Sequence, residues 1–336
     1  MTYIIDSVFN KKNYDERIDF IKGYCILCVV LNHCIEHMKE VLFPIWGSPA
    51  VALFILIQVF HAYKKGPQTA KFNLPTIWKR ILKPFLFVQF LLIFIWLMCY
   101  DMPITDQLKL IIYKGGKGPG SYYVWIYIQI AFLLPLFATF LHKTGKIVSL
   151  FVFILISQLS EILLCALSIP DYIYVLLCFR YIFIIYLGYL LTSEPFKLSS
   201  VSISLSILSL LSLIFFSYCN IPVEPFFYNH CNFTTCHWTC YFYVSILLLF
   251  LLIYVYKRIH NRYKIIATIF CLMGKQSYNI FLLQMFYFSL LDIFPIKPLF
   301  STIATGILYE VLIVIFSVVI CVIPIILYST KRKNET

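Results

Sequence analysis

Long apolar stretches alternate with short polar segments along almost all of the 336-residue chain. Each stretch is close to the roughly 20 residues that an α-helix needs to cross a bilayer. Continuous runs of this kind predict transmembrane helices, because the strands of a membrane β-barrel alternate apolar and polar residues. We predict spans at residues 20–38, 48–63, 79–100, 122–141, 147–167, 172–192, 199–218, 238–256, 265–291 and 299–328.

The pattern therefore predicts an all-α polytopic membrane protein with about ten transmembrane helices and both termini in the cytoplasm. The expected domains are a cytoplasmic tail over 1–18, a transmembrane domain over 19–329 and a second cytoplasmic tail over 330–336. The first segment is polar, so we expect a retained first helix rather than a cleaved signal peptide. The last two spans are long enough to tilt or to begin as interfacial helices.

Composition and charge agree with a membrane protein. The chain is 61% hydrophobic and 12% charged, whereas soluble domains are about 25% charged. Its net charge of +12 comes from Lys and Arg that fall mostly in segments placed inside by an even number of spans. Topology and contact with anionic lipid headgroups explain this excess, so we predict membrane lipids and no nucleic acid as partners.

The first predicted span carries an unusual set of polar residues, namely Lys22, Asn32, His33, Glu36 and His37. A charge at the centre of a bilayer costs about 3 kcal/mol, so residues of this kind usually have a function. His33 lies about 16 Å along the helix from Lys22 and shares a face with Glu36 and His37. A histidine there is suited to accept a proton near neutral pH. The alternative is a histidine that only packs in the bundle, bonded to a carbonyl or to Asn32.

The run from His33 to His37 also matches the H-x-x-E-H pattern of certain zinc enzymes. Two histidines one helical turn apart can share a zinc ion. No third ligand is evident in the sequence, and the helix is expected to lie in the membrane. We therefore predict no metal.

The cysteines fall into two groups. Eight lie in predicted spans, Cys165 among them, and are expected to act as small apolar residues. The others surround the predicted outer loop at 219–237, where free thiols, a disulfide and a zinc site stay open. This second group consists of Cys219, Cys231, Cys236 and Cys240.

Basic residues gather at the predicted inner mouth of the bundle. A cytosolic polyanion such as a nucleotide or coenzyme A would need such groups, and contact with lipid headgroups is the alternative. The set is Arg17, Lys22, Lys64, Lys65, Lys79, Arg80 and Lys83.

Three further features lie toward the outer side. Arg180 opens the sixth predicted span, either as a residue that reaches to the membrane surface or as a binder of an anionic or sugar substrate. The glycine-rich segment 115–120 lacks the order of a phosphate loop, so we expect a flexible loop or a lid. Aromatic residues at the start of the fourth span, Tyr122, Tyr123, Trp125 and Tyr127, indicate an interfacial belt or a surface that stacks on sugar rings.

Two segments carry a resemblance to a known family. Arg17–Tyr24, followed by Val29–His33, resembles the first helix of the acyltransferase-3 family, which has a basic residue, ten intervening residues and a histidine, as in Lys22 and His33. Gly274–Gln284 resembles the ninth helix of that family. The departures are Lys22 and Lys83, where the family usually has Arg, and Gln284, where His is common.

The resemblance implies an integral-membrane O-acyltransferase of the cell inner membrane, multi-pass, with no metal cofactor. It would move an acyl group, acetyl in the first instance, from cytosolic acyl-CoA (acetyl-CoA) to a hydroxyl of a lipid-linked or exported cell-surface glycan. A homo-oligomer stays open. Two other functions also remain: a transporter or flippase for a glycan or small molecule, and a structural partner in glycan export. Paired broken helices and an internal repeat are typical of transporters, and the sequence indicates neither.

The resemblance also implies roles for individual residues. His33 would be the general base or a transient acyl carrier, with Asp19 orienting or balancing the cationic groups around it. Three residues would bind the coenzyme phosphates: Lys22, Arg80 and Lys83. Three others would contact the substrate: Glu36, Arg180 and Gln284.

Overall fold

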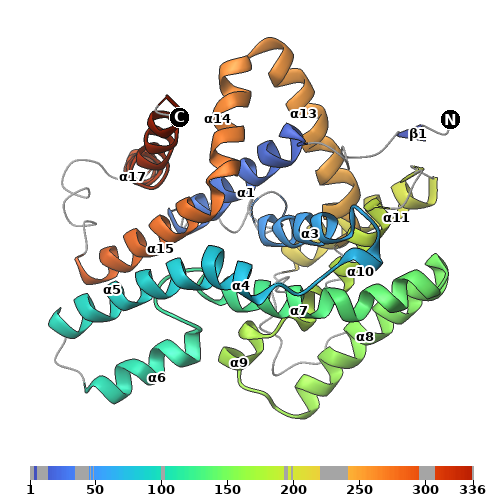
Figure 1. Cartoon of the computed structure of the whole chain (residues 1–336), viewed down its shortest axis with the longest axis horizontal. Helices are drawn as coiled ribbons and strands as arrows, with labels where there is room; N and C mark the ends of the chain where they lie inside the picture. Colours follow the sequence, from blue (N-terminus) through green and yellow to red (C-terminus); the bar gives the residue numbers. More distant parts are fainter. Residues whose placement is uncertain are drawn as a thin grey trace.

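The computed structural model is helical almost throughout, which confirms the all-α prediction (Figure 1). Its only described strands are β1 (Ile4–Ile5) and β2 (Phe196–Lys197), which pair antiparallel and join the N-terminal segment to the chain after the sixth predicted span. The structure describes residues 4–5, 14–34, 45, 47, 49–99, 103–192, 196–197, 200–219, 241–294 and 307–334.

Each predicted span is matched by one or more helices, and further short helices lie in the loops predicted between the spans. In the first half of the chain these are α1 (Glu16–Cys34), α3 (Ala50–Tyr63), η1 (Pro67–Thr69), α4 (Leu74–Ile77), η2 (Trp78–Leu82), α5 (Lys83–Cys99), α6 (Ile104–Lys114), α7 (Tyr122–Lys143) and α8 (Lys146–Ala166). In the second half they are α9 (Asp171–Leu176), η3 (Phe179–Tyr181), α10 (Ile182–Thr192), α11 (Ser200–Tyr218), η5 (Tyr243–Leu248), α13 (Leu249–Arg262), α14 (Lys264–Lys275), α15 (Ser277–Ile293) and α17 (Ile307–Asn334).

Not every one of these helices is long enough to cross a membrane. Within the described residues, five are long and apolar enough, and a sixth span results if α14 and α15 are counted together. The five are Leu74–Cys99, Tyr122–Lys143, Lys146–Ala166, Tyr243–Arg262 and Glu310–Tyr328. The number of ten spans and the cytoplasmic location of both termini stay predictions.

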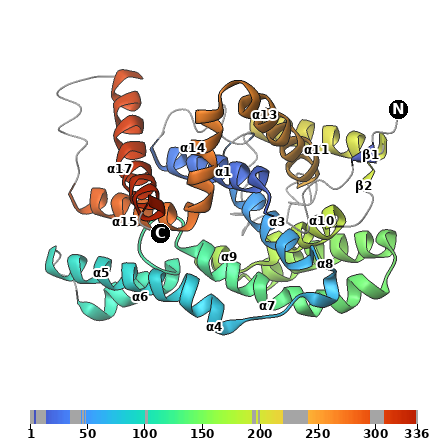
Figure 2. The same cartoon turned by 45° about the horizontal axis from the view of Figure 1, so that its top comes forward.

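The ninth predicted span is broken. α14 and α15 are bent by 74° relative to each other at Gln276, so the span predicted over 265–291 consists of two helices that run in different directions. α14 instead forms a hairpin with α13, and α15 leaves it in a different direction (Figures 1 and 2). The apolar run gave no sign of this bend, because Lys275 and Gln276 interrupt it for only two positions.

The sixth predicted span is also broken, between α9 and η3. Backbone groups that leave a helix inside a bilayer must find partners within the protein. Gln129 of α7 is the partner of two such groups. Its side-chain NH2 donates to the Leu176 carbonyl at 2.6 Å, and its side-chain oxygen accepts from the Cys178 N–H at 3.1 Å. A buried break of this kind is stable only with such a partner.

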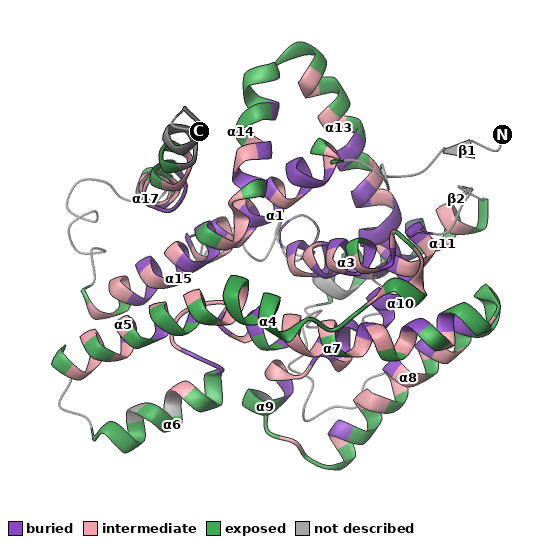
Figure 3. Cartoon of the chain, viewed as in Figure 1, coloured by how far each residue is buried: buried purple, intermediate pink, exposed green. Residues whose placement is uncertain are grey.

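Burial is highest in the centre of the molecule. More than half of the residues in α1, α3 and α10 are buried, whereas α5 and α8 have few buried residues and α6 is mostly exposed (Figure 3). Beyond Lys83 at its start, the exposed residues of α5 are apolar, as expected of a surface that faces lipid rather than water. They include Phe87, Phe90, Phe94 and Met98.

The cysteines follow the expectation with one exception. Cys25, Cys28, Cys34, Cys99, Cys178, Cys271 and Cys321 are free, as is Cys219. Cys165, however, is disulfide-bonded, so its assignment as a simple apolar residue was wrong. It lies in the last turn of α8, which the predicted topology places on the outer, oxidising side of the membrane. Cys231, Cys236 and Cys240 lie outside the described residues.

The N-terminal half of α1 crosses α14 at backbone contact. A Cβ atom added at Gly274 would overlap the carbonyl oxygen of Asp19, and one added at Gly23 would overlap that of Phe270. Small residues at such crossings let two helices approach closely, and van der Waals packing then holds them together. Both glycines are therefore required by the packing of α1, which carries the candidate base.

We expect Gly274→Ala to lower the free energy of unfolding by about 3 kcal/mol, because the added methyl must push α1 away from α14. The midpoint of thermal unfolding in detergent measures this effect. Gly145→Ala is the matched control, since no atom lies within 4 Å of a Cβ at that position. Equal midpoints for the two variants would contradict the close crossing.

Candidate functional site

One stripe of α1 lines a cavity of about 330 Å³ in the middle of the bundle. The stripe consists of Lys22, Ile26, Val29 and His33, which follow each other at helical spacing and face the same side. Lys22 and His33 thus stand at two ends of the same cavity, about 16 Å apart along the helix axis. Asn32 lines the cavity beside His33.

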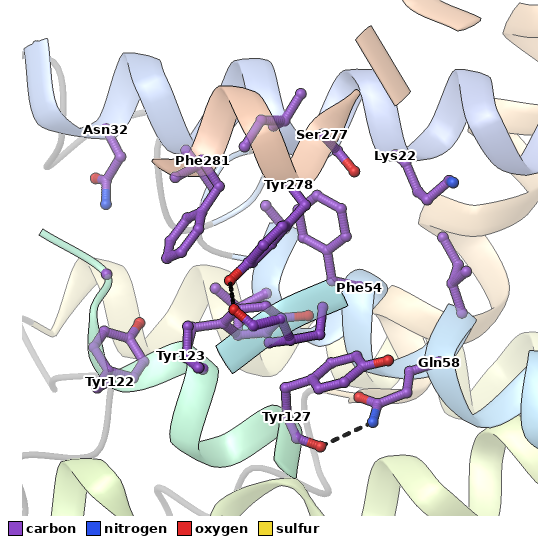
Figure 4. A pocket seen from close by; sticks show the side chains of 18 of the residues that line it. Lys22, Asn32, Phe54, Gln58, Tyr122, Tyr123, Tyr127, Ser277, Tyr278 and Phe281 are labelled. Atoms are coloured by element: carbon purple, nitrogen blue, oxygen red, sulfur yellow. Dashed lines mark hydrogen bonds between the residues drawn. The ribbon is translucent and has the colours of Figure 1, made fainter. Parts of the chain in front are cut away.

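Three other helices form most of the remaining wall, and Gly47, Ile81 and Gly120 complete it. α3 contributes Phe54, Gln58 and His61, α7 contributes tyrosines from its first turns, and α15 contributes the start of its helix (Figure 4). The Gln58 amide donates to the Tyr127 carbonyl at 3.0 Å and ties α3 to α7. The lining is mostly aromatic and aliphatic, with a few polar groups on it, as is typical of small-molecule sites. Its aromatic members are Phe54, Tyr122, Tyr123, Tyr127, Tyr278 and Phe281.

His33 is half-buried in the last turns of α1 and faces the cavity. Its ring also packs against Phe288 of α15, with centroids 5.6 Å apart. Glu36 and His37, which complete the H-x-x-E-H run, lie outside the described residues. Within the described part of the chain no cluster of three His, Cys, Asp or Glu residues is arranged to hold a metal ion.

Lys22 and Asp19 form an ion pair at the other end of the stripe. The Lys22 ammonium lies 2.7 Å from one Asp19 carboxylate oxygen, and the Tyr14 hydroxyl donates to the other. Asp19 is only 4% exposed, so the pair compensates a buried carboxylate. Burial and the neighbouring Asp19 together raise the pKa of Tyr14, which keeps its hydroxyl protonated as a donor. The resemblance implied that Asp19 balances nearby cationic groups, and in the structure it forms an ion pair with one of them, Lys22.

Arg80 and Lys83 do not line the cavity. Both side chains are exposed at the start of the third predicted span, next to Ile81, which does line it. A π-helical turn, η2, holds this segment, and the Tyr278 hydroxyl donates to the Ile81 carbonyl at 2.6 Å. Tyr278 thereby ties the start of α15 to the π-helical segment.

Arg180 lies behind the cavity wall. Its side chain is buried, and its guanidinium stacks on Tyr122 at 5.2 Å and on Tyr181 at 4.8 Å. A side chain that reaches to the membrane surface would be exposed. The buried Arg180 does not fit this alternative. Because Tyr122 lines the cavity, Arg180 contacts the wall from outside rather than the cavity itself.

The glycine-rich segment 115–120 is a packed wall, so the prediction of a flexible loop or lid was wrong. Gln89 of α5 donates to the Lys117 carbonyl at 2.9 Å and accepts from the Lys117 N–H at 2.5 Å. Gln284 of α15 is fully buried and donates to the Pro119 carbonyl at 3.2 Å. Gly120, at the end of the segment, lines the cavity directly. Gln284 therefore supports the wall rather than lining the site.

Glycine is required in this segment for two reasons. Gly118 has φ +94°, a conformation that other residues rarely adopt. A Cβ atom there would also lie 2.8 Å from the Met285 carbonyl oxygen, so α15 leaves no room for a side chain. The sequence showed the glycines but not that neighbouring helices enclose them.

Several lining residues had no role assigned from the sequence. Gln58 and His61 interrupt the second apolar run, and this was the signal that α3 has a polar face. Tyr122, Tyr123 and Tyr127 were expected either in an interfacial belt or on a sugar-stacking surface, and the structure places them on the cavity wall. Gly274–Gln284 had pointed to the ninth span, and Ser277, Tyr278 and Phe281 from it line the cavity.

Comparison with known proteins gives one match. The sequence profile of the acyltransferase-3 family, described as an acyltransferase domain, matches residues 15–326. The matched region includes every helix that lines the cavity. Comparisons with curated proteins and with solved structures give no match.

We expect Gln89→Leu to loosen the segment 115–120. The backbone N–H and carbonyl of Lys117 would lose their hydrogen bonds to Gln89 and stay partly buried without a partner. Each buried group left unpaired costs about 1–3 kcal/mol. Hydrogen exchange followed by mass spectrometry should show faster exchange confined to residues 115–120. Gln68→Leu, at an exposed position, should leave that exchange unchanged. Unchanged exchange in Gln89→Leu would show that other contacts hold the wall.

Proposed function

We propose a specific reaction for this chain, which belongs to the acyltransferase-3 family and is therefore a multi-pass membrane acyltransferase. In the proposal it moves an acetyl group from acetyl-CoA to a hydroxyl of a lipid-linked or exported glycan. The observation that carries the proposal is the shared cavity of His33 and Lys22. One cavity there connects a proton acceptor, His33, with a cationic group, Lys22.

The proposed mechanism uses His33 as general base. The imidazole takes the proton from the acceptor hydroxyl while the hydroxyl oxygen attacks the thioester carbonyl. A transient acyl-imidazole on His33 is the second form of the same mechanism. The apolar lining of the cavity supports both, because it excludes the water that would compete for the acyl group.

The proposed donor enters from the inner face. Lys22 lines the cavity, and Arg80 and Lys83 are exposed in the segment around Ile81, which also lines it. Such groups suit the phosphates of coenzyme A, while the narrow apolar cavity suits its thioester arm. In this arrangement Asp19 holds the Lys22 ammonium in place.

The proposed acceptor approaches the His33 end. Aromatic rings line the cavity there, and the apolar faces of sugar rings stack on aromatic side chains. Arg180 and Gln284 act in this proposal by holding Tyr122 and the glycine-rich wall against the substrate. Glu36, three residues after His33 in the sequence, is proposed to contact the acceptor. The proposed location is the cell inner membrane, with both termini in the cytoplasm.

One observation favours the transporter function as a second candidate. The break between α14 and α15 is of the kind that transporters use at their binding sites, and the sequence had not indicated it. A transporter would move its substrate without breaking a thioester. Release of free coenzyme A by purified protein separates the two functions.

We expect His33→Ala to abolish acetyl transfer, with a loss of at least about 10²-fold because the general base is removed. Membranes with matched amounts of protein would be assayed for thiol release from acetyl-CoA and for glycans heavier by one acetyl group. His142→Ala, at an exposed histidine on α7, is the control and should keep wild-type activity. Full transfer by the His33 variant would exclude the proposed base.

We expect Lys22→Gln to raise the KM for acetyl-CoA about 10-fold, since one charged contact with phosphate is worth about 1.4 kcal/mol or more. The turnover number should change much less. Added salt should raise the wild-type KM by screening the same attraction. Lys264→Gln, which removes an exposed lysine at the start of α14, serves as control. An unchanged KM in Lys22→Gln would place the coenzyme elsewhere.

A further inference from the structure

Asn32 differs from the other amide side chains around the cavity. Gln58, Gln89, Gln129 and Gln284 each hold a backbone group of another segment. The carboxamide of Asn32 has no hydrogen-bond partner in the part of the chain that the structure describes. It points from α1 into the cavity, toward Tyr122 and Tyr123 (Figure 4).

Asn32 is half-buried, and its amide lines the cavity with its hydrogen-bonding groups available. Polar groups in such a position are usually satisfied by water or by a ligand. Since the side chain projects into the cavity beside His33, a ligand there is within reach of both residues.

The positions of Asn32 and His33 suggest that each contacts a different atom of a bound substrate. Successive residues of a helix point about 100° apart, so Asn32 and His33 approach the same space from two directions. A planar carbonyl between them would have its oxygen on one side and the attacking hydroxyl on the other. Acyl transfer needs this combination of a donor at the oxygen and a base at the nucleophile.

We propose that the Asn32 amide stabilises the negative oxygen of the tetrahedral intermediate, a role that rests on the function proposed above. The acceptor oxygen forms a bond to the thioester carbon, and the carbonyl electron pair moves to the oxygen, which accepts a hydrogen bond from Asn32. His33 takes the hydroxyl proton. The C–S bond then breaks, the electron pair returns to reform the carbonyl, and the leaving thiolate receives the proton from His33. The products are the ester and free coenzyme A.

The test compares two substitutions at Asn32 with the same substitution at an exposed asparagine. Asn32→Asp keeps the size and loses the N–H donor, and Asn32→Ala removes the group without adding charge. We expect the turnover number to fall about 10²–10³-fold in both, with the KM for acetyl-CoA within about threefold of wild type. Asn279→Asp, at an exposed asparagine on α15, should keep both constants.

The outcomes are distinct. A turnover number within threefold of wild type in Asn32→Ala overturns the role of Asn32 and leaves the proposed function intact. A rise in KM together with a lower thermal midpoint would show a packing role, and this also overturns the proposal. If the wild type itself releases no thiol and acetylates no glycan, the proposed function has failed, and the role of Asn32 fails with it.

Discussion

A polar group inside a bilayer has to find its partner within the protein, and this constraint organises the whole chain. The helices that break inside the bundle do so where a side chain takes over the freed backbone groups. Gln129 does this at the break after α9, and Tyr278 does it at the π turn before α5. In η5, the hydroxyl of Ser209 accepts from the Tyr243 N–H. At each of these irregular segments a side chain from another helix binds a backbone group.

The same constraint makes the cavity possible. Its walls come from helices that are held together by amides and hydroxyls, such as Gln58 on Tyr127 and Tyr278 on Ile81. Asn32 faces the cavity between them. Lys22 is compensated by Asp19, which allows a charged residue to stand at the mouth of an otherwise apolar site.

Part of this arrangement was predictable from the sequence. Helical spacing alone places Lys22 and His33 on one face of α1, and the polar positions Gln58 and His61 mark the face of α3 opposite to it. The packed glycine-rich wall, the buried Arg180 and the bend at Gln276 were not predictable. Each depends on contacts between segments far apart in the chain, such as Gln89 with Lys117 or Arg180 with Tyr122. The periodicity of apolar residues indicates which side chains are buried or face lipid. It does not indicate which residues of other helices they contact.

The crossing of α1 and α14 has a mechanical consequence. Two helices whose backbones touch, with no side chain between them, cannot slide along each other without a collision at Gly23 or Gly274. The contact at Gly23 against Phe270 and the contact at Gly274 against Asp19 lie one helical turn apart, so together they also oppose a change of crossing angle. The crossing therefore fixes how far α1 extends past α14, and with it the position of His33 in the cavity.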